Sequence, residues 1–366
     1  MGNKIFHFLI VSLLFFLPFV YFPFGTSYWE TPKVYVTELL IFFLLIVTIF
    51  QSKKLFVKKK RPLLICCGII VCLSLYHLTF LQTDYTLWGN PFRMQGVLLL
   101  WFMLLFCYLA SYEPFKRISP FLIGGLLVMQ VILAFAVDSG SLGRAVGSIG
   151  EPNSLAGIMI VTWPFLYFSI KDKRWQRLSL VFAVILVGLI ILLAGSRSGL
   201  VAFVIQILVF CGIIVMRWSI KKVVVICLFL LVCAAFLPFV EKGSVYENRG
   251  EVWQSGVVAG LAHPFLGNGF GNTEFALNTA SIKLNNHLQG YYLDSAHNIF
   301  LDWWVQGGIV GVSVVVFLFY KTFATFIATK QTRNLIILLG LLAVVSFNPV
   351  SIALLIYLWW LIGQGN

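Results

Sequence analysis

Among the residues that could carry out chemistry, His297 has the most informative surroundings. It lies in the run DSAHNIFLDWW, where Asp294 or Ser295 could be the N-cap of a helix and place His297 in its first turn. The positive end of a helix lowers the pKa of a histidine and favours the neutral imidazole that a general base requires. Asp294 would raise that pKa, so the net direction stays open. We expect His297 to be a general base, with a structural role at the helix start as the alternative.

Four arginines lie in glycine-containing segments at the ends of apolar runs. They are Arg93 in WGNPFRMQG, Arg144 in GSLGRAVGSIGEPNSLAG, Arg197 in AGSRSG and Arg249 in NRGEVWQSGVVAGL. A guanidinium group binds phosphate oxygens through paired hydrogen bonds, and glycine leaves neighbouring backbone amides accessible. If these side chains converge they suit a diphosphate group, which the spacing alone does not establish. The alternative is that each arginine lies at the membrane interface and binds lipid head groups.

Other polar side chains give weaker indications. His263, His287 and His297 are separated by 24 and 10 residues, which matches no compact ligand motif, so we expect no metal site and no cofactor. His263 and His287 are expected to be exposed loop residues. Glu38 and Asp302 lie within apolar runs, where each could be a functional acid or a buried partner of another polar group.

The elements that position these residues are predicted to be membrane helices. The chain is 60% hydrophobic and 11% charged, with mean hydropathy +0.96, whereas soluble domains are about 25% charged. We therefore predict an all-α polytopic membrane protein, with one transmembrane bundle over residues 1–366. A span needs about 20 apolar residues, which predicts about twelve transmembrane helices, near 5–24, 34–50, 62–81, 97–111, 120–137, 154–170, 178–194, 198–216, 223–240, 298–319, 334–347 and 350–363. The last two divide one long apolar tail at Phe347-Asn348-Pro349.

The net charge of +13 follows the expected topology. If residue 1 faces the cytoplasm and the spans alternate, 19 of the 26 Lys and Arg residues fall in cytoplasmic segments. This is the positive-inside pattern, so the basic charge indicates orientation and not nucleic-acid binding. Both ends of the chain are expected in the cytoplasm, and the first span is expected to stay uncleaved because no small-x-small site follows it.

The polar stretch 241–297, between spans 9 and 10, is the longest predicted outer loop. We expect it to form an extracytoplasmic subdomain that carries part of the active site. Residues 246–261 have the pattern of an amphipathic helix lying on the membrane, with Arg249 and Trp253 on one stripe. His263-Pro264 ends that helix, and FLGNGFGN is expected to be a turn close to substrate or bilayer.

With these segments in place, the chain resembles the O-antigen ligase and polymerase superfamily. The resemblance rests on two runs, NRGEVWQSGVVAGLAHPFLGNGFGNTEF and DSAHNIFLDWWVQGGIVG. In them an Arg and a Trp on a helix precede an HP-hydrophobic-GxGxG run, and an HN motif leads into GIxG. The segments RMQG, EPNSLAG and SRSG also stand in the expected order, so the resemblance extends over residues 90–320.

The resemblance implies a metal-independent glycosyltransferase on the outer face of the cytoplasmic membrane. Such enzymes join a glycan carried on undecaprenyl diphosphate to a glycan or lipid-glycan acceptor. By position, His297 matches the family's essential histidine, and Arg197 and Arg249 match arginines that hold the lipid diphosphate. Arg93 and Arg144 match less closely. Ligase, polymerase and protein-directed oligosaccharyltransferase are all compatible, because the sequence does not specify the acceptor.

A transporter or flippase of lipid-linked glycans is the alternative. Such a protein is expected to place charges at the middle of the membrane, where they line a pathway. Here the charged residues gather near the predicted outer face instead. The sequence therefore favours a membrane enzyme that binds membrane lipids and a lipid-linked donor.

Overall fold

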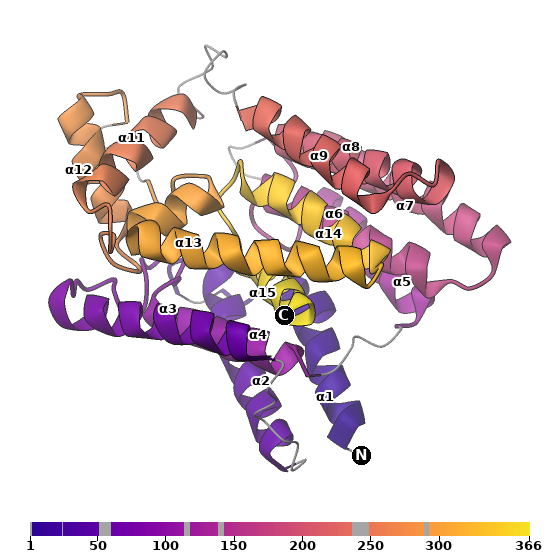
Figure 1. Ribbon diagram of the computed structural model, residues 1–366. Helices are drawn as coiled ribbons and strands as arrows, with labels where there is room; N and C mark the ends of the chain where they lie inside the picture. Colours follow the sequence, from indigo (N-terminus) through magenta and orange to yellow (C-terminus); the bar gives the residue numbers. More distant parts are fainter. Residues whose placement is uncertain are drawn as a thin grey trace.

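The computed structural model describes residues 2–23, 25–50, 60–112, 118–137, 143–235, 249–288 and 293–366. Within these ranges the chain is all-helical and contains no strand. Figure 1 shows the helices, which are α1 (Gly2–Val11), α2 (Glu30–Phe50), α3 (Arg61–Phe80), α4 (Val97–Ala110), α5 (Pro120–Ala136), α6 (Pro152–Ser169), α7 (Lys173–Ala194), α8 (Arg197–Phe210), α9 (Ile220–Ala235), α11 (Arg249–Ala262), α12 (Thr273–Leu284), α13 (Ile299–Ala328), α14 (Thr332–Val345) and α15 (Ile352–Gly365). Short π and 3-10 turns extend α1 to Phe19, and a π turn extends α8 to Val215.

Every predicted span overlaps one of these helices. Among the described residues, five helices are long and apolar enough to cross a membrane: α2, α3, α7, α8 with its π turn, and α13. Shorter apolar helices are α1 with its continuation, α4, α5, α14 and α15. The chain is therefore a multi-pass membrane protein, while the number twelve stays a prediction. Helix α13 runs to Ala328, beyond the predicted end at 319, because its apolar pattern continues past Lys321.

The break predicted in the C-terminal tail is confirmed. Helix α14 ends at Val345 and α15 begins at Ile352, with Asn348-Pro349 between them. Asn348 donates a side-chain hydrogen bond to the Val344 carbonyl (2.7 Å), which also accepts from the Phe347 amide (3.2 Å) in the last turn. Pro349 has no N–H with which to continue the helix. Nearly all of α14 and α15 is buried, so this break lies inside the bundle.

Helix α6 forms the centre of the bundle, and its side chains from Pro152 to Tyr167 are all buried. It packs against α7, α14 and α5. Gln206 of α8 joins three helices here: it accepts from Trp163 Nε1 (2.6 Å) and donates to the carbonyls of Ile160 and Ile336 (3.1 Å each). A buried amide satisfied on all sides ties neighbouring helices in one register, since an unpaired polar group is costly in an apolar interior.

The helices alternate in direction, so the connecting segments form two ends. The described segments 20–23, 25–29, 81–96, 143–151, 195–196, 249–288, 293–298 and 346–351 lie at one end, which we call the site end. Contacts between distant segments confirm this grouping: Gln95 donates to the Val350 carbonyl (2.7 Å), and Glu30 accepts from the Ile352 amide (3.0 Å). The alternation agrees with the predicted topology.

Helices α11 and α12 form a lid beside the start of α13 (Figure 1). Helix α11 spans Arg249–Ala262 where the periodic pattern predicted a helix over 246–261, and residues 246–248 fall outside the described part. Helix α12 was not predicted, because TEFALNTASIKL has little amphipathic contrast. The lid packs on α13 through a small core of its own, in which Val252, Leu277 and Val305 are buried. Close approach needs Gly256, where a Cβ would lie 2.6 Å from Leu301 Cδ2.

The glycine-rich run after α11 has a different role from the one predicted. Helix α13 is kinked at Gly308 (φ 60°, ψ −162°), a conformation that L-residues rarely adopt. The amides of Asn268 and Gly269 donate to the carbonyls of Val305 and Gln306, while the amides of Ile309 and Val310 donate to Pro264 and Phe265. The run thus inserts into the kink and exchanges hydrogen bonds with both of its sides, instead of forming a free turn.

His77 of α3 holds the same run from the other side. The amide of Phe270 donates to His77 Nδ1 (3.2 Å), so Nε2 carries the proton and donates to the Leu266 carbonyl (2.8 Å). His77 therefore fixes the loop that supports the kink in α13.

Candidate functional site

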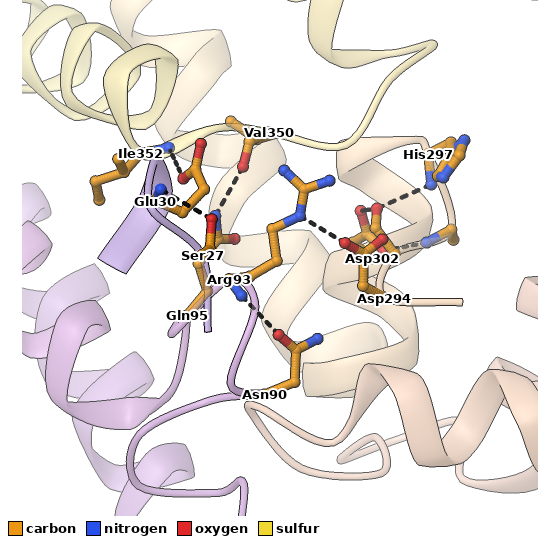
Figure 2. A network of polar contacts seen from close by, with 12 residues as sticks. Ser27, Glu30, Asn90, Arg93, Gln95, Asp294, His297, Asp302, Val350 and Ile352 are labelled. Atoms are coloured by element: carbon orange, nitrogen blue, oxygen red, sulfur yellow. Dashed lines mark hydrogen bonds and ion pairs between the residues drawn. The ribbon is translucent and has the colours of Figure 1, made fainter. Parts of the chain in front are cut away.

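The sequence predicted that His297 lies in the first turn of a helix. In the structure it lies just before α13 instead. The N-cap is Asn298, whose Oδ1 accepts from the amides of Phe300 (3.0 Å) and Leu301 (3.2 Å). Ser295 instead bonds Asp302 and the His297 amide, so it is not available as a cap. His297 is half-buried and has a left-handed backbone (φ 55°). Its imidazole points away from Asp302 and Asp294 (Figure 2).

Arg93 supports the segment that leads to His297. Its Nε donates to Asp294 Oδ2 at 2.6 Å, and both side chains are about nine-tenths buried. The Arg93 amide donates to Asn90 Oδ1 (2.7 Å), which fixes the backbone of the loop between α3 and α4. Burial alone would lower the pKa of Arg93, but the charges of Asp294 and Glu30 outweigh it and raise that pKa. Arg93 is therefore a permanent buried cation beside the histidine segment.

The pKa of His297 is lowered from its ordinary value. Burial is the largest cause, because it disfavours the charged imidazolium. The cations Arg249 and Arg93 lower the pKa further, while Asp294 and Glu151 raise it. The sequence predicted that Asp294 raises the pKa of His297, and it left the net direction of the shift open. In the structure the net shift lowers this pKa, which favours the neutral imidazole. This is the protonation state that a general base needs near pH 7.

A chain of buried polar side chains connects Arg144 to Arg249. Arg144 donates to Asn153 Oδ1 (3.2 Å), which also accepts from Ser196 Oγ (2.9 Å). Ser196 Oγ lies 3.4 Å from Ser198 Oγ. The chain continues through Asn348, which donates to Ser198 Oγ (2.6 Å) and accepts from an Arg249 terminal nitrogen (3.3 Å).

This chain of contacts brings three of the predicted arginines to one place. Arg197 lies between the two linked serines, as the first residue of α8, and its side chain is exposed. Arg144 also donates to the carbonyls of Ala194 (2.7 Å) and Gly195 (3.3 Å), which anchors it to the α7–α8 turn. His297 lies close enough to both Arg249 and Arg93 for their charges to lower the pKa of its imidazole, which links Arg93 to the same group. All five predicted site residues therefore lie at the site end.

The starts of six helices meet around these side chains, namely α2, α6, α8, α11, α13 and α15. Each helix start carries partial positive charge from unpaired amides, and this adds to the arginines. Glu151 caps α6 by accepting from the amides of Asn153 (3.0 Å) and Ser154 (2.5 Å). Helix starts and arginines are both groups that bind anions, and here they stand among the carboxylates of Glu30, Glu151 and Asp294.

Several residues of this arrangement were not identified from the sequence. Asn348 appeared only as part of a helix break, and Glu30 only as an outer-face carboxylate, although it bonds the first amide of α15 (Figure 2). Lys33, fully buried, donates to the carbonyls of Trp29 (2.8 Å) and Ser148 (3.1 Å). Each of these three residues has a charged or amide side chain near the end of a predicted span, and this position could have marked it as a site candidate.

An apolar groove opens beside the histidine, between α11 and α13. Its volume is about 770 Å³, and Gln254 and Asn298 are its polar lining residues. Trp253 and Trp304 line it with aliphatic side chains, and Trp253 stacks on Phe347 at the α14–α15 break (centroids 6.1 Å apart). The groove therefore begins one turn beyond Arg249 and one residue beyond His297.

The other two lid histidines lie at the surface, as predicted. His263 is exposed, and His287, with a side chain 90% exposed, faces Glu251 at 3.2 Å. In the described part of the chain, no group of three or more His, Cys, Asp or Glu side chains is placed to share a metal ion.

The family model of O-antigen ligases matches residues 182–316. Over these residues the chain is similar to O-antigen ligases. The match to the ligase family runs from within α7 into α13, and it includes Arg197, Arg249 and His297. This confirms the resemblance inferred from the sequence motifs.

The chain is also similar to the ComP-specific O-oligosaccharyltransferase of Acinetobacter baylyi, with 24% identity over 216 residues. The alignment covers 52% of this chain and 38% of that relative, so the chain spans well under half of the relative's length.

Proposed function

We propose that this ligase-family protein is a membrane glycosyltransferase. It would transfer a glycan from undecaprenyl diphosphate to a hydroxyl of a glycan or lipid-glycan acceptor. The observation that carries the proposal is the placement of half-buried His297, whose pKa is lowered by burial and by the charges of Arg249 and Arg93, at the site end. A base and a cluster of cations are the two parts that such a transfer needs.

In the proposed reaction, the acceptor oxygen attacks the anomeric carbon of the donor sugar. His297 takes the proton from the acceptor hydroxyl as the new glycosidic bond forms. The bond from the anomeric carbon to the diphosphate oxygen breaks, and its electron pair leaves with undecaprenyl diphosphate. The protonated imidazole then releases its proton to solvent.

The arginines would bind and stabilise the leaving diphosphate. Arg249 and Arg197 are the proposed direct ligands, because Arg197 is exposed at the start of α8 and Arg249 is linked to that turn through Asn348. Arg144 is anchored to the same turn, and Arg93 is paired with Asp294. Both would add positive potential without binding the diphosphate directly. Fixed cations in a site of low polarity stabilise developing negative charge without a metal ion.

The groove between α11 and α13 would hold the first isoprene units of the carrier. Its apolar lining matches a hydrocarbon chain, and it begins beside the residues proposed to bind the diphosphate. Burial of apolar area there would contribute about 25 cal/mol per Å² to donor binding.

The positive-inside pattern supports an extracytoplasmic position for the site end. Among the described residues, the opposite end carries Lys and Arg in segments 60–61, 171–177 and 217–222. We propose that the protein lies in the cytoplasmic membrane with the site facing outward. The relative from Acinetobacter supports a transfer of oligosaccharide to an acceptor, while the family match supports ligase chemistry.

The test is glycan transfer by purified protein from an undecaprenyl-diphosphate donor, with EDTA present and product measured by mass spectrometry. His297→Ala is expected to reduce transfer about 10²- to 10⁴-fold, the usual contribution of a general base. Arg249→Ala is expected to reduce it about 10²- to 10³-fold, because leaving-group charge loses a partner.

Matched controls are His287→Ala in the lid and Arg174→Ala at the opposite end, both at exposed positions. Both are expected to retain full transfer. Retained activity in His297→Ala would rule out the base assignment. Movement of carrier lipid across vesicles by a wild-type protein that transfers nothing would establish the flippase alternative.

A further inference from the structure

Both carboxylate oxygens of Asp302 bind the segment that carries His297. Oδ2 accepts from Ser295 Oγ at 2.7 Å, and Oδ1 accepts from the Ala296 amide at 2.6 Å. Both distances are in the range of hydrogen bonds to an ionised acceptor. Asp302 lies in the first turn of α13, where the positive helix end favours a carboxylate. Its side chain therefore reaches back over the helix start to the preceding turn.

Ser295 transmits this restraint to the histidine. Its hydroxyl donates to Asp302 and at the same time accepts from the His297 amide (2.9 Å). The contact from Ser Oγ to the amide two residues later is a turn-forming hydrogen bond. Ser295 and Ala296 are buried, so water is not a ready substitute for either bond.

The backbone of His297 requires such restraint. Its φ of 55° is in the left-handed region, which a residue with a Cβ adopts only when its neighbours hold it there. On the other side of the turn, Asp294 is held by Arg93. The turn is thus fixed between two carboxylates, of which Asp302 bonds the two residues directly before the histidine.

Asp302 is placed to act through the turn and not on a substrate. It is 9% exposed, and Figure 2 shows the imidazole of His297 pointing away from it. The cavity that Asp302 lines has a volume of about 80 Å³. That volume suits a few water molecules at roughly 30 Å³ each, not a glycan.

We infer that Asp302, acting through Ser295 and the Ala296 amide, is the positioning residue that sets the direction of the His297 imidazole. The inference rests on the proposed function for its catalytic consequence, since a base displaced by about 1 Å loses about 10²-fold in rate. This role accounts for Asp302, the acidic residue within the predicted span 298–319.

The first experiment measures kcat and KM for donor transfer in Asp302→Ala, Asp302→Asn and Ser295→Ala. Asp302→Ala is expected to lower kcat about 10²-fold while the KM for donor stays within about twofold, since the arginines are untouched. Asp302→Asn keeps one acceptor oxygen and should retain more activity than Asp302→Ala. Ser295→Ala should lower kcat roughly ten- to a hundredfold, the value of a hydrogen bond to a charged group. Ser255→Ala, a buried lid serine that accepts from Asn286 (3.0 Å), is the matched control and should keep full kcat.

A double-mutant comparison separates positioning from a general structural effect. In a His297→Ala background, adding Asp302→Ala is expected to cause no further loss, because the group that it positions is gone. A further loss of the same size as in the wild type would overturn the inference, as would unchanged kcat in Asp302→Ala.

A second measurement needs no transfer activity. Diethyl pyrocarbonate modifies accessible neutral imidazoles, and its rate at each histidine can be followed by mass spectrometry. Asp302→Ala is expected to speed modification of His297 severalfold and to leave His263 and His287 unchanged. An unchanged rate at His297 would overturn the positioning role. If the wild-type protein transfers no glycan but this rate rises, the proposed function fails and the positioning inference stands.

Discussion

At the scale of single residues, the protonation state of His297 depends on groups that shift its pKa in opposite directions. Burial and the two nearby cations, Arg249 and Arg93, favour the neutral ring, while Asp294 favours the protonated one. The neutral form dominates because burial penalises charge whatever its neighbours are. A base that stays neutral close to an anionic donor matches the proposed chemistry, since the donor itself would raise the pKa of the histidine when bound.

The pH dependence of transfer follows from this balance. Because a protonated imidazole cannot accept a proton, kcat/KM should fall as the pH drops through the His297 pKa. That pKa is lowered, so the acidic limb should lie below the ordinary histidine value of about 6.5. Asp294→Asn removes a group that raises the pKa and should move the limb to still lower pH.

The measurement is a pH profile of kcat/KM for donor transfer. Glu251→Gln is the control, because Glu251 pairs with exposed His287 and is not among the groups that shift His297. A limb that moves upward in Asp294→Asn, or one that moves equally in Glu251→Gln, would contradict this account.

At the scale of elements, the site depends on places where helices stop or bend. The break between α14 and α15 gives Asn348 access to α8 and α11 at once, and the kink in α13 receives the glycine-rich run after α11. An uninterrupted helix pairs its own backbone amides and carbonyls, so none would be free to bond another segment. Interruptions in membrane helices are tolerated where other protein groups replace the lost hydrogen bonds.

Asn348→Ala should weaken both the bundle and the site. It removes hydrogen bonds to Ser198 and Val344 and the acceptor for Arg249, at a side chain only 1% exposed. Loss of a buried polar partner costs about 1–3 kcal/mol. We expect lower thermal stability in detergent together with at least a tenfold loss of kcat/KM, because Arg249 loses its orientation.

Asn334→Ala is the matched control for that substitution. Asn334 is a buried asparagine at the opposite end of α14, where it donates to Gln331 Oε1 (2.7 Å). It should lower stability to a similar extent and leave kcat/KM of the folded protein unchanged. Equal losses of kcat/KM in both variants would show that the link from Asn348 to Arg249 has no specific role.

Gly308→Ala should destabilise the kink of α13. The left-handed conformation alone costs an L-residue roughly 1–3 kcal/mol, and the new Cβ would lie 2.3 Å from the Phe265 backbone. Gly188→Ala in α7 is the control, since a Cβ there meets no atom within 4 Å, and alanine is the better helix former. Thermal unfolding in detergent should show a lower transition temperature for Gly308→Ala only; equal transitions would contradict the role of the kink.

At the scale of the whole molecule, the two ends of the bundle differ in composition. The site end gathers the lid, the candidate site residues and the starts of several helices, while the opposite end holds the basic turns such as 171–177. The alternation of the helices enforces this division, because each apolar helix carries the chain from one end to the other. The membrane then separates the two sets of segments, and the positive-inside rule assigns the basic set to the cytoplasm.

The orientation can be tested by labelling introduced cysteines in intact cells. A membrane-impermeant maleimide should label His287→Cys, at a side chain 90% exposed on the lid, without cell disruption. Lys330→Cys, exposed at the opposite end, should be labelled only after the membrane is opened. The wild-type protein gives the background of its own seven cysteines. Labelling of both sites from outside, or of Lys330→Cys alone, would invalidate the topology.

Sequence reasoning succeeded where a property is carried by many consecutive residues. The positions of the apolar helices, the division of the tail at Asn348 and the start of α11 near Arg249 follow from hydropathy, proline and periodicity. It failed where several short polar residues compete for one role. Asp294, Ser295 and Asn298 are all capable N-caps, and only their neighbours decide that Asn298 caps α13 while Ser295 bonds Asp302.

The sequence by itself determined that this is a helical membrane protein with motifs similar to those of O-antigen ligases, and it gave His297 and four arginines as candidates, because hydropathy and motifs are local properties of the chain. Only the tertiary structure decided how they meet. Arg144 and Arg249 are joined through Asn153, Ser196, Ser198 and Asn348, which come from three separate parts of the chain. The pKa of His297 is likewise lowered by burial and by cations distant in sequence. Contacts of this kind depend on helix packing across the bundle, and no local pattern encodes them.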